Sequence, residues 1–306
     1  MKQFIRKIFA FTVIPLACIV IGLILIAYIS KTIDYKLGPG ITEIYIGDSH
    51  IQCAINDSLL ENSKNVSKAA ESFYYSYYKL KKLIEKNQHI EKVYLGVGYH
   101  SLSNYFDKFI NGEYVPSVSP KYFYLLPGEV QCKLVAWNRK NFPPFIKEVA
   151  RIGYSYLIKE VTFSSSFGYS NNYTHEMASK PSMEKRLQYQ FYTNGKLNDF
   201  SAINLIYLNK IINLCKTNKI DLVFLNAPIH PYYRSKIPAN YIARFNEIAN
   251  AYHVQVIDFS NLSLGDSCFI PNGDHVSEKG AYEVTNELIR LKQNIRNIGN
   301  NDQPHH

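Results

Sequence analysis

The sequence lacks the residue patterns that are typical of metal sites. It contains nine histidines and five cysteines, but no HExxH pair and no CxxC spacing. We therefore expect neither a metal ion nor another cofactor. It also lacks a run of basic residues that resembles a nucleic-acid arm, because its 34 Lys and Arg are scattered. The formal charge of +9 is interpreted as a solvated basic surface, and no nucleic-acid partner is expected.

Charge is absent from one long stretch near the N-terminus. Residues 8–29 contain no charged side chain over a length that can cross a bilayer as a helix, and three basic residues precede them. A cleaved signal peptide is the alternative, but the stretch is long for one and no small-residue cleavage site closes it. We expect a retained single-pass anchor within residues 1–30 and a polar linker over 31–40. The slight positive-inside bias favours an extracytoplasmic domain.

Apolar runs alternate with helical patterns along most of the remaining chain. Runs typical of buried strands lie at 41–47, 64–68, 91–98, 220–225 and 254–257. Helical spacing is found at 72–86, 202–217, 239–252 and 277–291. This alternation predicts an α/β fold, a three-layer sandwich around a parallel sheet, over residues 41–296. The polar tail from 297 to 306 is expected to be disordered.

The regular pattern breaks down between residues 101 and 200, which we interpret as an insertion. Short helices are expected near 130–138 and 145–158. The insertion is rich in aromatic residues, in a chain that has 25 Tyr and 17 Phe. Most of them should be core, but a few should face a cleft, where flat rings can stack on sugars. The candidates are Tyr105, Phe106, Tyr114, Tyr122, Phe123, Tyr124 and Trp137.

Four polar segments follow the predicted strands or precede the last helix. They are Gly47-Asp48-Ser49, Tyr99-His100, the Asn226-Ala-Pro turn and Asp274-His275. The carboxyl ends of parallel strands meet at one edge of a sheet, where ligands bind in folds of this kind. We therefore predict that these segments form one site. In particular, the side chains of Ser49 and His275 should lie within hydrogen-bonding reach, directly or through one water.

A serine and a histidine brought together in this way suit nucleophilic catalysis. The serine hydroxyl attacks a carbonyl only if a base takes its proton and donors stabilise the resulting oxyanion. His275 is the candidate base, and Asp274 or Asn272 is the candidate group that orients it. The backbone N–H of Ser49 is one candidate oxyanion donor. The others are small or polar residues after the second and third strands: Ala69, Ala70, Gly98 and His100.

These motifs resemble those of the SGNH (GDSL-type) hydrolase superfamily. The matching elements are Gly47-Asp48-Ser49 after the first strand and Asp274-His275 followed by Val-Ser-Glu-Lys-Gly-Ala. The chain also resembles the membrane-anchored branch that includes alginate O-acetylation proteins and the D-alanyl transfer protein of teichoic acid synthesis. The resemblance covers roughly residues 41–100 and 202–291. It implies a flavodoxin-like sheet, with Ser49 as nucleophile and His275 as base.

The sequence departs from the family pattern at two blocks. The family's aspartate stands three residues before the histidine, where this chain has Asn272. Whether Asp274 reaches the Nδ1 of its own neighbour is open, so a dyad or another carboxylate, Asp258 or Asp266, remains an alternative. The asparagine of the third block, an oxyanion donor in the family, is replaced by Tyr99-His100. His50 is interpreted as a neighbour of Ser49 and not a participant, because its side chain should diverge from that of Ser49. His100 and His230 are each interpreted as structural or substrate-facing and not catalytic.

The resulting hypothesis is a serine-dependent esterase or O-acyltransferase that acts on a cell-envelope or extracellular polysaccharide. Its expected partners are an acylated glycan or small acyl ester, the membrane through residues 8–29, and proteins of envelope polysaccharide synthesis. One alternative is a catalytically impaired glycan-binding or assembly subunit. Another is a lipid esterase, although the insertion has no long apolar lid pattern. Four cysteines of the domain could form disulfides or remain thiols: Cys53, Cys132, Cys215 and Cys268.

Overall fold

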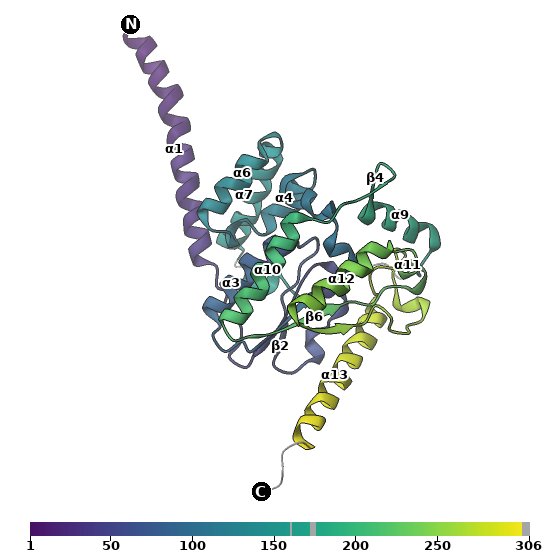
Figure 1. Ribbon diagram of the computed structural model, residues 1–306. Coiled ribbons are helices and arrows are strands. Elements are labelled where there is room, and N and C mark those ends of the chain that lie inside the picture. The colour runs from purple at the N-terminus through teal and green to yellow at the C-terminus, as the bar shows by residue number, and fades with distance from the viewer. Residues whose placement is uncertain (160, 172–175, 302–306) are drawn as a thin grey trace.

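The structure, a computed structural model, describes residues 1–159, 161–171 and 176–301. Its centre is a parallel sheet of five strands in the order β2-β1-β3-β6-β7 (Figure 1). The strands are β1 (Glu43–Ile46), β2 (Ser63–Asn65), β3 (Lys92–Gly96), β6 (Asp221–Asn226) and β7 (Gln255–Asp258). The predicted α/β fold with a parallel sheet is confirmed, and each strand overlaps the apolar run that predicted it.

Helices cover both faces of the sheet, which explains why its strands read as apolar runs with weak alternation. Ile44, Val93 and Phe224 lie in one core cluster with residues of three helices, α3 (Phe73–Lys86), α10 (Ala202–Thr217) and α12 (Ala239–Tyr252). Tyr45, Tyr94 and Val223 point to the other face, which packs against α2 (Ser49–Ala54) and α13 (Glu278–Asn301). The side chains of neighbouring strand positions therefore form two separate cores, as the two-residue period of a strand requires.

A close backbone approach places α2 at the carboxyl end of the sheet. A Cβ added to Gly96, the last residue of β3, would lie 2.3 Å from Cγ1 of Ile51 in α2. Gly47, which follows β1, would bring a Cβ 3.0 Å from the same atom. The two glycines let the short helix pack directly on the strand ends. Ser49, its first residue, is thereby held at the edge where the sequence predicts the site.

The insertion is mostly helical and has its own buried aromatic residues. It contains α4 (Lys108–Asn111), α5 (Val115–Val118), α6 (Gly128–Trp137), α7 (Phe142–Ile158), α8 (Phe163–Ser166), α9 (Lys180–Phe191) and the hairpin β4 (Tyr192–Thr193) and β5 (Lys196–Leu197). Helices α6 and α7 confirm the two that were predicted, whereas α9 was not predicted. Tyr122, Phe145 and Phe163 are completely buried. Cys132 is exposed, and Cys132, Cys215 and Cys268 are free thiols.

The N-terminal helix α1 (Lys2–Thr32) is long and apolar enough to cross a membrane, a test that a signal sequence also passes. Its last turn packs on the domain, since Ile29 is buried beside Gly153 of α7. The expected polar linker is also held on the domain, by Asn87 at the end of α3. The Leu37 N–H donates to Asn87 Oδ1 (2.6 Å), and Asn87 Nδ2 donates to the Tyr35 carbonyl (2.9 Å). At the other end, α13 continues to Asn301, into the expected tail, and residues 302–306 lie outside the described residues.

Candidate active site

Ser49 lies at the N-terminus of α2, directly after β1. Asp48 caps this helix, because its Oδ1 accepts a hydrogen bond from the His50 N–H (2.9 Å). The first amides of a helix have no acceptor within the helix. The N–H of Ser49 is one of these amides, and it donates to no other group in the described part of the chain. It can therefore donate to a bound ligand at the strand end.

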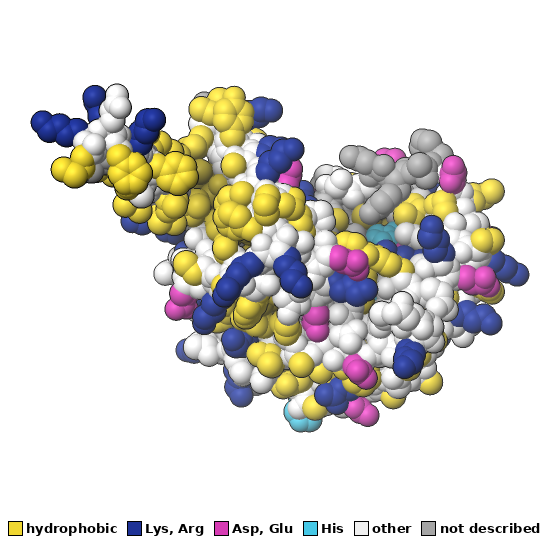
Figure 2. Space-filling view, turned by 90° about the horizontal axis from the view of Figure 1, so that it is seen from above, with side chains coloured by type: hydrophobic (Ala, Val, Ile, Leu, Met, Phe, Trp, Pro, Cys, Tyr) yellow, Lys and Arg dark blue, Asp and Glu magenta, His cyan; other side chains and the backbone are white. Residues whose placement is uncertain are grey.

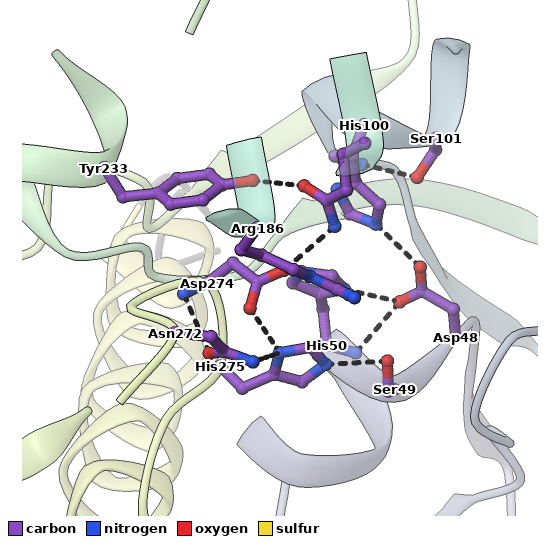
Figure 3. A network of polar contacts seen from close by, with 12 residues as sticks. Asp48, Ser49, His50, His100, Ser101, Arg186, Tyr233, Asn272, Asp274 and His275 are labelled. Carbon is purple, nitrogen blue, oxygen red and sulfur yellow. Dashed lines mark hydrogen bonds and ion pairs between the residues drawn. The ribbon is translucent and has the colours of Figure 1, made fainter. Parts of the chain in front are cut away.

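The loop before α13 brings His275 to this serine from 226 residues away. Ser49 Oγ lies 2.7 Å from His275 Nε2, which confirms the predicted proximity. Figure 3 draws this contact as a dashed line. The loop turns at Gly273, whose φ of +66° lies in the left-handed region that glycine adopts without strain. A hydroxyl bonded to a buried imidazole nitrogen has the geometry of a nucleophile paired with its base.

Asp274 reaches the other nitrogen of its neighbour His275. Its Oδ1 lies 2.6 Å from Nδ1, whereas Asn272 Nδ2 lies 3.3 Å from the same nitrogen. Asp274 therefore makes the carboxylate contact to Nδ1 of His275, although the family pattern that the motifs resemble has its aspartate at the position of Asn272. The alternative carboxylates are occupied elsewhere: Asp258 accepts from Asn226 Nδ2 (3.0 Å), and Asp266 contacts His230 (3.1 Å).

The second oxygen of Asp274 is held by the insertion. Its Oδ2 accepts hydrogen bonds from Arg186 Nε (2.6 Å) and Gln190 Nε2 (2.9 Å), both of which come from α9. The Tyr233 hydroxyl in turn donates to Gln190 Oε1. Sequence reasoning missed Arg186 and Gln190, because the family resemblance does not extend to the insertion and α9 was not predicted. Together with His275 Nδ1 at Oδ1, these two donors hold the carboxylate in a fixed position.

The side chain of His50 contacts residues from both motifs, and we call the group of Asp48, His50, His100, Asp274 and His275 the polar network. The ring of His50 is stacked between those of His100 (centroids 3.8 Å apart) and His275 (4.3 Å). Its Nδ1 is 3.1 Å from Asp48 Oδ1, and its Nε2 forms a 3.3 Å ion pair with Asp274 Oδ2. The imidazole thus bridges the carboxylate of the first motif and that of the last one.

The charges of the network follow from these contacts. Burial opposes ionisation of both carboxyls, but the adjacent cations and donors hold the pKa of Asp48 and of Asp274 well below the usual range. Burial would lower the pKa of His50, but Asp48 and Asp274 raise it to about 9. The pKa of His275 is lowered by burial and, despite Asp274, stays below that of a free histidine. His275 is thus neutral at pH 7, as a general base must be.

Besides the Ser49 amide, two of the candidate donors to an oxyanion already form hydrogen bonds to other protein groups, and two donate to none within the described residues. The Gly98 N–H donates to Ser101 Oγ (3.2 Å), and His100 Nε2 contacts Asp48 Oδ2 (2.7 Å), so neither is available where an oxyanion would form. Ala69 and Ala70 line the cleft beside Ser49, and their amides donate to no other group in the described residues. Ala70 has a φ of +63°, a strained value for a residue with a Cβ, and such strain is concentrated at functional sites.

A buried ion pair holds the loop that carries Ala70. Lys79 of α3 donates to the carboxylate of Glu71, the next residue, and to the Val66 carbonyl at the start of the loop. Ser76 Oγ donates to the other oxygen of Glu71 (2.7 Å). Breaking a buried pair of this kind by removing one partner costs roughly 3–5 kcal/mol. We therefore interpret the pair as a support that fixes the direction of the Ala70 amide.

A cleft of about 430 Å³ opens on Ser49 and His275. The insertion supplies its aromatic lining, which consists of Tyr105, Phe106, Phe109, Tyr114 and Tyr189. Three of the seven predicted candidates, Tyr105, Phe106 and Tyr114, therefore line the cleft. Tyr122, Phe123 and Tyr124 are buried in the insertion instead, and Trp137 is exposed on α6. The volume accommodates a small acyl group together with part of a larger molecule.

Two groups of side chains have donor atoms close enough to surround a metal ion. They are Asp48, His50 and His100, and His50, Asp274 and His275, with the donor atoms of each group within 4.8 Å of one another. In both groups these atoms already contact one another, and Arg186 adds a positive charge at Asp274. The charged imidazole of His50 occupies the place between the two carboxylates that a cation would take. The arrangement fits an ion-pair network better than a metal centre.

Comparisons with known proteins yield similar folds. No family model matches the sequence, and no curated protein matches it. A GDSL-like lipase from Bacteroides thetaiotaomicron is 10% identical, with a TM-score of 0.37 over 87% of this chain and 94% of that one. An acylhydrolase structure from Bacteroides fragilis is 10% identical, with a TM-score of 0.40 over 87% and 93%. A structure named as a platelet activating factor from Streptococcus pneumonia is 12% identical, with a TM-score of 0.41 over 92% and 98%.

Proposed function

We propose that this chain is a serine-dependent acyl-ester hydrolase with Ser49, His275 and Asp274 as its catalytic residues. The observation that carries the proposal is the continuous contact from Ser49 Oγ to His275 Nε2 (2.7 Å) and from His275 Nδ1 to Asp274 Oδ1 (2.6 Å). This contact lies at the base of a cleft. A hydroxyl, a neutral imidazole and a buried carboxylate in that order form the constellation that performs acyl transfer on several unrelated folds.

The geometry supports a two-step reaction. Ser49 Oγ attacks the ester carbonyl carbon while its proton passes to His275 Nε2, and the amides of Ser49 and Ala70 donate to the oxyanion. The intermediate then expels the alcohol, which takes the proton from His275 and leaves an acyl group on Ser49. A water, activated by the same histidine, releases the acid. Asp274 stabilises the positive charge on His275 during both steps.

We further propose that the ester is an acyl group, such as acetyl, on a cell-envelope or extracellular glycan. Two observations support this narrower assignment. Tyr114 and Tyr189 line the cleft and combine an aromatic face with a hydroxyl, which suits stacking on a sugar ring. Helix α1, if it is retained as an anchor, keeps the domain next to the membrane. A sugar hydroxyl that replaces water in the second step would make the same site an O-acyltransferase.

Turnover of p-nitrophenyl acetate by the purified full-length chain tests the proposal. The wild type should release nitrophenol, and Ser49→Ala should lose this activity. Ser58→Ala is the matched control, because Ser58 is exposed and its hydroxyl bonds to the side chain of Asn56 (2.7 Å). Acetylated glycans then separate the outcomes: free acetate indicates hydrolysis, and acetate moved to an added glycan indicates transfer. Glycan binding without any ester turnover would instead favour a binding or assembly subunit.

A further inference from the structure

Helices α6 and α7 expose an unusual share of large apolar side chains. Beyond residue 32, twelve such side chains are exposed among the described residues, and five of them fall between 137 and 158. These five, with exposed fractions of 39–63%, are Trp137, Phe142, Tyr154, Leu157 and Ile158. Scattered exposed apolar residues are normal, whereas their concentration on one pair of helices marks an interaction surface. We call these five residues the α6–α7 apolar set.

The same pair of helices holds the end of α1. Ile29 packs against Gly153 of α7, where an added Cβ would lie 3.0 Å from Ile29 Cδ1. Leu157 lies one helical turn beyond Gly153 on the same face. Figure 1 shows α6 and α7 beside α1, with their connecting turn directed to the side of the domain from which α1 emerges. Phe142, at that turn, lies about 16 Å along α7 from Gly153.

Basic side chains accompany the apolar ones. Lys133, Arg139, Lys140 and Lys147 are exposed on α6, on α7 and in the turn between them, and none forms an ion pair with the rest of the described chain. Figure 2 views this end of the molecule and shows apolar side chains gathered beside α1, with Lys and Arg side chains among them. Tryptophan, lysine and arginine beside apolar residues are typical of a segment at a membrane interface.

We propose that α6 and α7 form a second membrane contact, in which the α6–α7 apolar set enters the headgroup region of the leaflet next to the domain. The four basic residues then lie at the level of anionic lipid headgroups. A bilayer is favoured over a protein partner because the surface is continuous with α1, the candidate span. Two attachments hold the domain at a fixed angle to the membrane, and this fixes the direction in which the cleft opens. The contact does not depend on the proposed ester chemistry.

The chain carries its own probe for this contact, since Trp137 is its only tryptophan. The full-length chain is reconstituted into vesicles of phosphatidylcholine and phosphatidylglycerol, with or without bromine on the acyl chains. Brominated chains quench tryptophan only on contact, so the proposal predicts a loss of Trp137 fluorescence in brominated vesicles and protection from aqueous acrylamide. Replacing Phe142 and Ile158 by Glu should diminish both effects, while α1 keeps the variant in the vesicle fraction.

The control moves the probe to the opposite end of the molecule. Tyr282 of α13 is 56% exposed, and α13 projects away from α1 (Figure 1). A chain with Trp137→Phe and Tyr282→Trp should show no quenching by brominated lipid and full access to acrylamide. The proposal is overturned if wild-type Trp137 is insensitive to brominated lipid and as open to acrylamide as the probe at position 282. That result would leave the surface for a protein partner.

Discussion

Asp274 binds the imidazole of the residue that follows it in the chain, with Oδ1 2.6 Å from His275 Nδ1. The loop that makes this contact turns at Gly273, and α9 holds the second oxygen of the carboxylate from the opposite side. The aspartate thus stands directly before the histidine, whereas the family that the motifs resemble has it three residues earlier, and it still contacts the Nδ1 of that histidine. Asn272, which occupies the usual position, makes only a longer contact to the same nitrogen (3.3 Å).

Substitutions at Asp274 and Asn272 should affect kcat very differently. Asp274→Asn should lower kcat for a small ester by about 10⁴-fold, because an amide stabilises the wrong tautomer and no longer offsets the charge on His275. Asn272→Ala should lower kcat by less than about 10-fold, the equivalent of roughly one weak hydrogen bond. Steady-state kinetics of both variants on p-nitrophenyl acetate provide the measurement. A larger loss in Asn272→Ala than in Asp274→Asn would reverse the assignment.

His50 should make stability depend on pH above neutrality. Its pKa in the folded chain is about 9, above the value of about 6.5 in an unfolded chain. The stabilisation from its charge is therefore complete below pH ~6.5 and is lost as the pH rises through about 9. Relative to His50→Gln, the wild type should lose on the order of 1–3 kcal/mol of unfolding free energy between pH 6 and pH 10. Denaturant unfolding in detergent measures this difference, and parallel curves would refute the bridging role.

Local sequence patterns were enough to locate the strands and two segments of the site, but not the contacts that the site residues make. The strands and the Ser49 and His275 segments could be located because apolar runs and short motifs are local features of the sequence. The role of His50 was missed because its position next to Ser49 suggested a diverging side chain, whereas α2 turns it between two carboxylates. Gly98 and His100 stand where oxyanion donors were expected, but their hydrogen bonds to Ser101 and Asp48 occupy them.

The contribution of the insertion could not have been read from its sequence. Arg186 and Gln190 lie in α9 at a spacing of four residues, which puts both on one face of the helix. Nothing in that stretch indicates that this face meets a carboxylate 84 residues further along the chain. Only the packing of α9 over the carboxyl ends of the strands creates the contact. The insertion thus completes the site as well as forming a wall of the cleft.

Arg186 provides a test of that conclusion. Arg186→Gln should lower kcat for a small ester by about 10- to 100-fold, as expected from the loss of a hydrogen bond between charged groups. Arg151→Gln is the matched control, because Arg151 forms an exposed pair with Glu148 (2.7 Å) that should contribute little. Both variants are compared by kinetics after their folding is verified by circular dichroism. Equal activities for the two variants would show that the contact of α9 with Asp274 does not contribute to catalysis.

The aromatic wall should affect large substrates and spare small ones. Tyr189 is 36% exposed and lines the cleft, so Tyr189→Ala should weaken binding of an acetylated glycan by about 5- to 10-fold, the value of one stacking contact. Turnover of p-nitrophenyl acetate should stay close to that of the wild type. Tyr252→Ala, at an exposed position on α12, is the control. Equal loss on both substrates without unfolding would place Tyr189 in the catalytic centre.

During turnover Ser49 should carry the acyl group as a covalent intermediate, which can be trapped and identified. The full-length chain is mixed with p-nitrophenyl acetate, quenched in acid within the first turnover, and analysed by peptide mass spectrometry. We predict an acetyl group on Ser49 in the wild type and no acetyl group at this position in Ser49→Ala. Ester turnover with no acyl group on Ser49, or turnover undiminished in Ser49→Ala, would show that Ser49 is not the nucleophile.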